Sequence, residues 1–323
     1  MNTAEQMREA PGRRPIDDRH LDGGGRDVLT CARQYGVMFD DFLIEDVVVG
    51  NETLHVRHGG AGPAVLLLHG HPRTGATWHR VAPKLVEAGF TVICPDLSGY
   101  GRSTSPAPSA DHSAHSKRAV ASDMARMMTV LGHERFHLVG HDRGSYVALR
   151  LALDYEHRID HLALLDCIPI SEHLARADAR FATMWWHWFF YAQPGIPERV
   201  ITADPASWYR GDRDAMGPEN HAEWREAIHN PHVVRAMLED YRAGLTIDRA
   251  HEEADKAAGR RLGVPLLLLW SLRDDLEQLY GDPRLIWNGW ATNVRGHGID
   301  SWHHIAEEAP AALAAALVDF LPR

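Results

Sequence analysis

The sequence predicts an α/β fold in which a mostly parallel sheet carries an inserted block of helices. Short apolar runs alternate with helical stretches over residues 36–168, a Trp-rich helical block occupies 169–261, and the alternation returns at 262–323. Alternating strands and helices favour a parallel sheet that is covered on both faces. Helices inserted between two strands are expected to form a cap over the carboxyl edge of the sheet, where open α/β folds bind ligands.

The individual elements follow in chain order. Residues 42–50 and 53–60 are typical of two antiparallel strands joined at Gly50 and Asn51. Short apolar runs, which indicate buried strands, lie at 64–70, 90–96, 136–141, 161–169, 264–271 and, more weakly, 292–295. Helical spacing of apolar residues or an Ala-rich composition indicates helices at 77–89, 116–131, 144–155 and 309–321.

Size and charge exclude several classes of partner. The chain has 323 residues, of which 45% are hydrophobic and 24% charged, as in an ordinary globular enzyme. A net charge of −10 argues against nucleic acid and anionic membranes, since both need a basic surface. The sequence has no run of eighteen apolar residues that could span a bilayer.

The first 35 residues are expected to form a flexible, solvated leader. They are rich in Gly, Arg and Asp and lack the apolar core of a secretory signal. The three cysteines, Cys31, Cys94 and Cys167, are far apart and odd in number. Reduced thiols in a cytoplasmic protein are therefore expected.

The segment "VGHDRGSYVALRLALD" at 139–154 carries the main chemical signal. A strand, a Gly-x-Asp-x-Gly turn and a helix are typical of a nucleophile elbow, in which glycines permit a sharp turn and the central side chain projects from the sheet. The central residue is Asp142, where a serine would attack acyl carbon. A carboxylate instead attacks saturated carbon and leaves an alkyl ester on the enzyme. The alternative is an aspartate that only caps the following helix.

Hydrolysis of such an ester needs a base, an acid that orients it and an oxyanion hole. His303 follows the last strand, where hydrolases with this elbow place their histidine, and its neighbour His304 is the competing choice. Two strand-end carboxylates, Asp166 and Asp274, are candidates for the acid. The "HGHP" turn after strand 64–70 is expected to supply the backbone N–H of His71 beside that of Arg143.

From about residue 36 to the end, the sequence resembles the fluoroacetate dehalogenases of the α/β-hydrolase superfamily. The resemblance rests on "HDRG", "LDCIP", "WWHWFF" and "EDYRAG". It implies an α/β-hydrolase fold, Asp142 as nucleophile and Arg143 as the residue that binds the substrate carboxylate. It favours Asp166 over Asp274 as the acid.

The resemblance also implies a halide site made by His187, Trp188 and Tyr241. Fluoride is a strongly hydrated anion, so its departure requires several converging donors, and an imidazole, an indole and a hydroxyl supply three. The alternative is that an aromatic cap packs like any core, and this packing role is expected for Trp185 and Phe189.

Two positions depart from the family pattern. Tyr146 stands where the family has a second carboxylate-binding arginine, and a hydroxyl contributes a hydrogen bond but no charge. Arg73 could compensate, although a solvated loop arginine is the expectation. Trp302 replaces a glycine before His303, and its bulk is expected to narrow the pocket or shift the imidazole.

The sequence therefore predicts a hydrolytic dehalogenase that acts on a small 2-halo carboxylate through an aspartyl ester. Its expected partner is a small organohalogen substrate, with no cofactor and no metal, and a homodimer is a further expectation. Epoxide hydrolysis is the alternative, because it shares the same machinery and needs tyrosines such as Tyr241 to protonate the opening oxygen. A ligand-binding protein on a hydrolase scaffold is a second alternative. A serine esterase is disfavoured, because Ser145 lies off the tip of the elbow.

Overall fold

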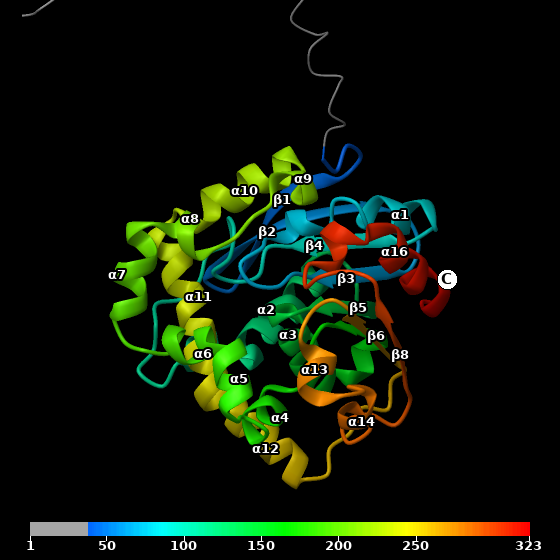
Figure 1. The fold of residues 1–323 in the computed structure, drawn as a ribbon. Helices are drawn as coiled ribbons and strands as arrows, with labels where there is room; N and C mark the ends of the chain where they lie inside the picture. Colours follow the sequence, from blue (N-terminus) through cyan, green and yellow to red (C-terminus); the bar gives the residue numbers. More distant parts are fainter. Residues whose placement is uncertain (1–37) are drawn as a thin grey trace, which may run out of the picture. The chain divides into compact units, whose positions relative to one another are not determined.

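The computed structural model describes residues 38–323, so the predicted leader and Cys31 lie outside the described residues. Within them, one sheet of eight strands has the order β1-β2-β4-β3-β5-β6-β7-β8 (Figure 1). β1 and β4 pair antiparallel with β2, and the remaining pairs are parallel, which confirms the predicted mostly parallel sheet. The strands are β1 Leu43–Val49, β2 Glu52–Gly60, β3 Ala64–Leu68, β4 Thr91–Pro95, β5 Phe136–His141, β6 Ile159–Leu165, β7 Leu266–Ser271 and β8 Val294–Ile299.

The helices that alternate with these strands are α1 Ala82–Glu87, α2 Lys117–Val130, α3 Arg143–Asp154, α13 Leu276–Tyr280, α14 Arg284–Trp287, α15 Ile305–Glu308 and α16 Pro310–Phe320. The predicted helices 116–131, 144–155 and 309–321 correspond to α2, α3 and α16, whereas α13, α14 and α15 were not predicted. Short 3₁₀ turns lie at η1 Gly75–Trp78, η2 Ser113–His115 and η3 Glu156–Arg158. The single helix predicted at 77–89 is instead η1 followed by α1, because Pro83 belongs in a first helical turn and so a new helix begins at Ala82.

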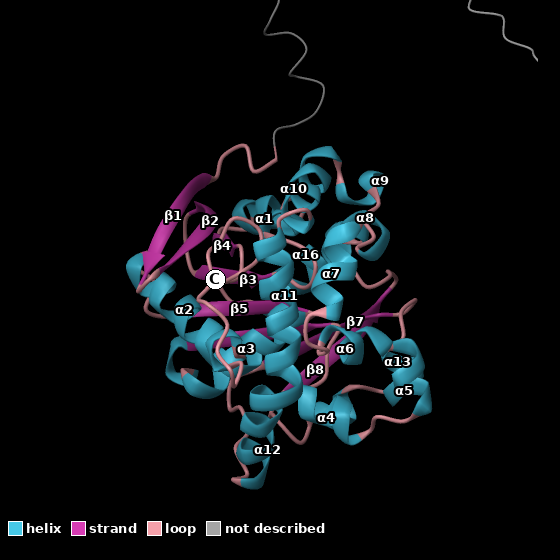
Figure 2. Cartoon of the chain, turned by 90° about the vertical axis from the view of Figure 1, so that its left-hand side faces the viewer, coloured by secondary structure: helices cyan, strands magenta, loops and turns pink. Residues whose placement is uncertain are grey.

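Between β6 and β7 the chain forms a series of helices joined by loops, as the sequence predicts for 169–261 (Figure 2). It contains α4 Ile170–Ala175, α5 Ala179–Met184, α6 Trp186–Tyr191, α7 Ile196–Ala203, α8 Pro205–Trp208, α9 Arg213–Met216, α10 Pro218–Ile228, α11 Pro231–Ala243, the π-helical turn η4 Gly244–Asp248 and α12 Arg249–Ala257. Among the described residues, no helix has the length and apolar character needed to cross a bilayer. That the helical segment 169–261 forms a cap domain separate from the sheet stays a prediction.

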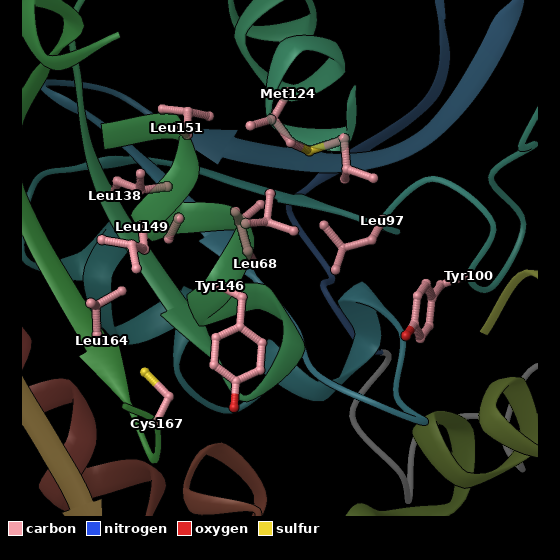
Figure 3. Packing of buried hydrophobic residues seen from close by; sticks show 14 of the residues in the cluster. Leu68, Leu97, Tyr100, Met124, Leu138, Tyr146, Leu149, Leu151, Leu164 and Cys167 are labelled. Carbon is pink, nitrogen blue, oxygen red and sulfur yellow. The ribbon is translucent and has the colours of Figure 1, made fainter. Parts of the chain in front are cut away.

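The two faces of the sheet are covered by different helices because side chains alternate along each strand. In β3, Leu66 and Leu68 pack in a cluster with α2 and α3, whereas Val65 and Leu67 pack with α1 and α16. Figure 3 shows part of the first cluster, with Met124 of α2 above leucines from the sheet and α3. Aromatic residues of the inserted helices, Trp188 and Tyr241 among them, belong to this same cluster. The sheet and the inserted helices therefore share one continuous core.

Candidate active site

The turn between β5 and α3 is a strained elbow centred on Asp142. Asp142 has φ 50° and ψ −118°, a conformation that non-glycine residues rarely adopt and that occurs mostly at functional sites. A Cβ on Gly140 would lie 2.5 Å from the carbonyl oxygen of Gly144, and one on Gly144 would lie 2.4 Å from that of His69. The two glycines that frame the motif are therefore required by close packing.

The Asp142 carboxylate projects into the site between two partners. Its Oδ1 accepts a hydrogen bond of 2.8 Å from the backbone N–H of His71, and its Oδ2 lies 3.7 Å from Nε2 of His303. It makes no side-chain hydrogen bond to the amides of α3, so the helix-cap alternative is not supported. Burial opposes ionisation, but the neighbouring His303 holds the pKa of Asp142 well below its usual value.

The predicted base contacts both predicted acids. Nδ1 of His303 lies 3.0 Å from Oδ2 of Asp166 and 3.1 Å from Oδ2 of Asp274. Burial lowers the pKa of His303, but the three surrounding carboxylates outweigh burial and raise it well above its usual value. The imidazole is therefore held as a cation while Asp142 is ionised.

Asp166 is the more firmly held of the two acids. It is buried, and Ser271 donates to it twice, from the amide to Oδ1 at 3.1 Å and from the hydroxyl to Oδ2 at 2.7 Å. The same hydroxyl lies 2.7 Å from the carbonyl oxygen of Trp302. Asp274 is partly exposed, with 28% of its side chain accessible. Sequence reasoning missed Ser271, because a serine at a strand end has no distinctive pattern.

The residue before the elbow, His141, also holds the base in place. Its Nε2 lies 2.7 Å from the carbonyl oxygen of His303, and burial lowers the pKa of His141 to about 4, so it is neutral and donates. His141, Asp166 and His303 bring potential metal-ligand atoms within 4.8 Å of one another. These atoms are already engaged in the hydrogen bonds just described, which accounts for their proximity.

The three residues of the predicted halide site lie together. The ring centroids of His187 and Trp188, both on α6, lie 6.0 and 6.2 Å from that of Tyr241 on α11. Burial lowers the pKa of His187 to about 4 and raises that of Tyr241, so at neutral pH both keep a neutral donor group. Within residues 38–323, no side chain or backbone oxygen accepts a hydrogen bond from the Trp188 indole or the Tyr241 hydroxyl.

Arg143 and Tyr146, the predicted carboxylate-binding pair, differ in how they are held. Arg143 is buried, with its guanidinium carbon 4.2 Å from the ring centroid of Tyr241, and its Nε donates to Asp240 at 2.5 Å. The Tyr146 hydroxyl lies 3.2 Å from Nε2 of His173, whose Nδ1 lies 2.7 Å from the Tyr280 hydroxyl. Tyr146 therefore joins a neutral hydrogen-bonded chain, which burial maintains by lowering the pKa of His173.

Three expectations from the sequence are wrong. Arg73 is buried and pairs with Glu307 at 3.0 Å, so it neither faces solvent nor serves the carboxylate position. Trp302 is 58% exposed and is not among the residues that line the cavity beside the site, so it does not narrow the pocket. Phe189 is 37% exposed on the outer side of α6 and is not a core residue.

Two other expectations hold. Trp185 packs against His173, with ring centroids 4.5 Å apart, and its indole also donates to Asp275 at 2.5 Å. Ser145 is fully buried and donates to the carbonyl oxygen of Gly140 at 2.7 Å, so it is structural and not a nucleophile.

A cavity of about 610 Å³ opens beside the site, and its lining includes His71, His187, Tyr191, Tyr209 and His304. Tyr191 was not predicted from the sequence, yet its ring centroid lies 4.9 Å from that of Tyr241. Tyr209 packs 5.2 Å from the ring of His71. Tyr209 lies outside the quoted motifs, and Tyr191 directly follows the "WWHWFF" run without being part of it, so their places beside the site are seen only in the tertiary structure.

Comparison with known proteins identifies the fold family of the chain. Residues 63–306 match the family model for the alpha/beta hydrolase fold. The chain therefore belongs to the α/β-hydrolase fold family. A fluoroacetate dehalogenase from Burkholderia sp is 38% identical over 88% of this chain and 95% of its own, which confirms the resemblance to the fluoroacetate dehalogenases.

Other relatives carry a different activity. An epoxide hydrolase from Caballeronia sordidicola is 40% identical over 85% of this chain and 92% of its own. Among solved structures, an α/β hydrolase from Nostoc sp PCC 7120 has a TM-score of 0.85 at 39% identity, covering 88% of this chain and 100% of that one. One from Pseudomonas aeruginosa, described as an epoxide hydrolase, has a TM-score of 0.80 at 39% identity, covering 87% and 95%. The relatives therefore divide between carbon–halogen and epoxide chemistry.

Proposed function

We propose that this protein is a hydrolytic dehalogenase that converts a small 2-halo carboxylate to the 2-hydroxy acid through an ester on Asp142. The observation that carries the proposal is a carboxylate at a strained elbow, flanked by an amide on Oδ1 and an imidazole beside Oδ2, with the donor groups of Trp188 and Tyr241 nearby. A serine hydrolase would need a hydroxyl at that point. The 38% identity to a fluoroacetate dehalogenase supports the same reaction.

In the first step, Oδ2 of Asp142 attacks the carbon that carries the halogen. The new C–O bond forms as the carbon–halogen bond breaks, and the halide leaves with the bonding electrons. His187, Trp188 and Tyr241 donate hydrogen bonds to the departing halide, which lowers the barrier because the charge develops among fixed donors in a buried site. Arg143 binds the substrate carboxylate and orients the carbon for attack.

In the second step, a water molecule attacks the carbonyl carbon of the Asp142 ester. Because Asp142 carries no charge once it is esterified, the imidazolium of His303 releases its proton to solvent. The neutral imidazole then removes a proton from the attacking water, while Asp166 and Asp274 stabilise the imidazolium that forms again. The oxyanion develops on Oδ1, which already accepts from the amide of His71, and the amide of Arg143 is the second proposed donor. Collapse of this intermediate breaks the ester bond, and the departing oxygen takes the proton held by His303 to give the 2-hydroxy acid. Asp142 then gives its remaining proton to His303 and returns to the carboxylate.

The direct test is halide release from fluoro-, chloro- and bromoacetate, measured for the wild type and Asp142→Ala. The wild type should release halide and form glycolate in equal amounts, whereas Asp142→Ala should release none. Halide release by Asp142→Ala at the wild-type rate would refute the aspartyl ester.

Epoxide hydrolysis is the second candidate, and the pairing of Tyr191 with Tyr241 favours it. Two tyrosines whose rings pack together can both donate protons to the oxygen of an opening epoxide, and burial raises the pKa of Tyr191 to about 12, which keeps its proton in place. Diol formation from a small epoxide, measured beside halide release, decides between the reactions. Tyr191→Phe should abolish diol formation but leave halide release largely intact.

A cytoplasmic location and a homodimer remain predictions. The described cysteines, Cys94 and Cys167, are both free and buried. Fractionation of the producing cells and light scattering of the pure protein would test the two predictions separately.

A further inference from the structure

The guanidinium of Arg143 is gripped along one edge by a single residue of α11. Its Nε donates to Oδ2 of Asp240 at 2.5 Å, and its Nη2 donates to the backbone carbonyl oxygen of Asp240 at 2.8 Å. Nε and Nη2 form one side of the planar guanidinium fork. The edge between Nη1 and Nη2 is therefore the one left for a substrate carboxylate.

Aromatic rings limit the movement of the same group. The guanidinium carbon of Arg143 lies 4.2 Å from the ring centroid of Tyr241, 5.2 Å from that of Tyr146 and 5.6 Å from that of Trp188. Within residues 38–323, no oxygen accepts a hydrogen bond from Nη1. The orientation of the free edge is thus set by Asp240 together with this aromatic enclosure.

Asp240 is in turn held from the core by Lys117, the first residue of α2. The Lys117 ammonium forms an ion pair with Oδ1 of Asp240 and lies 3.5 Å from Oδ2 of Asp248. Burial would raise the pKa of Asp240, but Arg143 and Lys117 outweigh burial and lower it. Asp240 is therefore ionised, and each oxygen of its carboxylate serves a different cation.

Gly244 provides space for the free edge of the guanidinium. A Cβ at this position would lie 3.0 Å from Nη2 of Arg143, closer than such contacts normally come. The backbone of Gly244, with φ −56° and ψ −47°, is ordinary helix, so its conformation alone would permit any residue. Gly244 also begins the π-helical turn that ends at Asp248, and such turns are frequent at functional sites.

We propose that Asp240 is a positioning residue that fixes the guanidinium of Arg143 for a substrate carboxylate, and that Gly244 is a specificity-determining residue that keeps the free edge clear. This inference rests on the proposed function in one respect, that Arg143 receives the carboxylate. On this inference, α11 and the π-helical turn after it determine how the site recognises the negative charge of the substrate carboxylate.

The experiment measures binding of glycolate and of its uncharged analogue glycolamide by calorimetry, independently of turnover. Gly244→Ala should weaken glycolate binding about tenfold and leave glycolamide binding unchanged, while the melting temperature stays at or above that of the wild type, since alanine favours a helix. Asp240→Asn should weaken glycolate binding more, because an amide oxygen cannot serve both cations.

Asp255→Asn is the matched control. Asp255 of α12 forms an ion pair with Arg150, which lies two turns after Arg143 on α3, and both side chains are buried. Loss of this ion pair should lower stability, as Asp240→Asn does, but should not change the ratio of glycolate affinity to glycolamide affinity. Unchanged ratios in Gly244→Ala and Asp240→Asn would overturn the inference. Failure of the wild type to bind glycolate or to release halide would instead refute the proposed function.

Discussion

Oδ2 of Asp274 lies 3.1 Å from Nδ1 of His303, almost as close as Oδ2 of Asp166 at 3.0 Å. The two strand-end acids that compete in the sequence are thus both at the base, one from β6 and one from β7. Together with Asp142, they make three carboxylates around the imidazole of His303. Each of them favours the protonated form of His303, and they differ in how firmly the protein holds them.

We predict that Asp166 contributes more to turnover than Asp274, and that Asp274 partly replaces Asp166 as the partner of His303 when Asp166 is removed. Asp166→Asn should lower kcat by about 10³-fold, less than the loss of about 10⁴-fold seen when a triad acid becomes an amide, because Asp274 remains at the base. Asp274→Asn should lower it less than tenfold, because Asp274 is partly exposed and lacks the Ser271 contacts. Steady-state kinetics of both single variants and of the double variant check this, and a larger loss in Asp274→Asn would reverse the assignment.

We predict that Arg143→Lys weakens binding of charged substrates although it keeps the positive charge. Lysine keeps the positive charge but cannot form a fork that bonds Asp240 and a carboxylate together. KM for chloroacetate should rise tenfold or more, whereas KM for chloroacetamide should change little. Equal losses on the two substrates would indicate that Arg143 only supports the fold.

We predict that the covalent intermediate accumulates when the base is removed. His303→Asn should release one halide per site and then stop, because only the second step needs the base. Mass spectrometry should find the substrate minus halide attached to the peptide that contains Asp142. In the wild type, a single turnover in ¹⁸O-water should label Asp142 and not the product, whereas direct attack by water would label the hydroxy acid.

We predict a burst of halide without turnover in mildly acidic solution. Ester formation removes the charge of Asp142, one of the groups that raise the pKa of His303, so the imidazole becomes easier to deprotonate in the intermediate. As pH falls below the pKa of His303 in the ester, the second step slows. The first step continues, because the pKa of Asp142 is held below its usual 3.8. Rapid-quench halide assays at pH 5 and pH 8 test this, and bursts of equal size followed by equal turnover would contradict it.

Local patterns predicted the parts of the site that local structure creates. The elbow at Asp142 follows from glycine spacing. The positions after strands give His303 and the two acids Asp166 and Asp274, between which only the family resemblance chose. The partner of Arg73 could not be predicted, because Glu307 lies 234 residues away and a solvated arginine has the same local pattern. The same reason applies to Asp240 and Tyr191, whose roles depend on how inserted helices pack over the sheet.

The hydroxyl of Ser271 has a single proton and two acceptors at 2.7 Å, the Asp166 carboxylate and the Trp302 carbonyl oxygen. A carboxylate is the stronger acceptor, so the proton stays with Asp166 as long as that acid is charged. Trp302, the residue just before the base, is then held through its backbone N–H, which donates to Glu308 at 2.6 Å, and not through its carbonyl oxygen. The Ser271 proton therefore couples the ionisation of Asp166 to how tightly the loop before His303 is held. Ser271→Ala would remove this coupling.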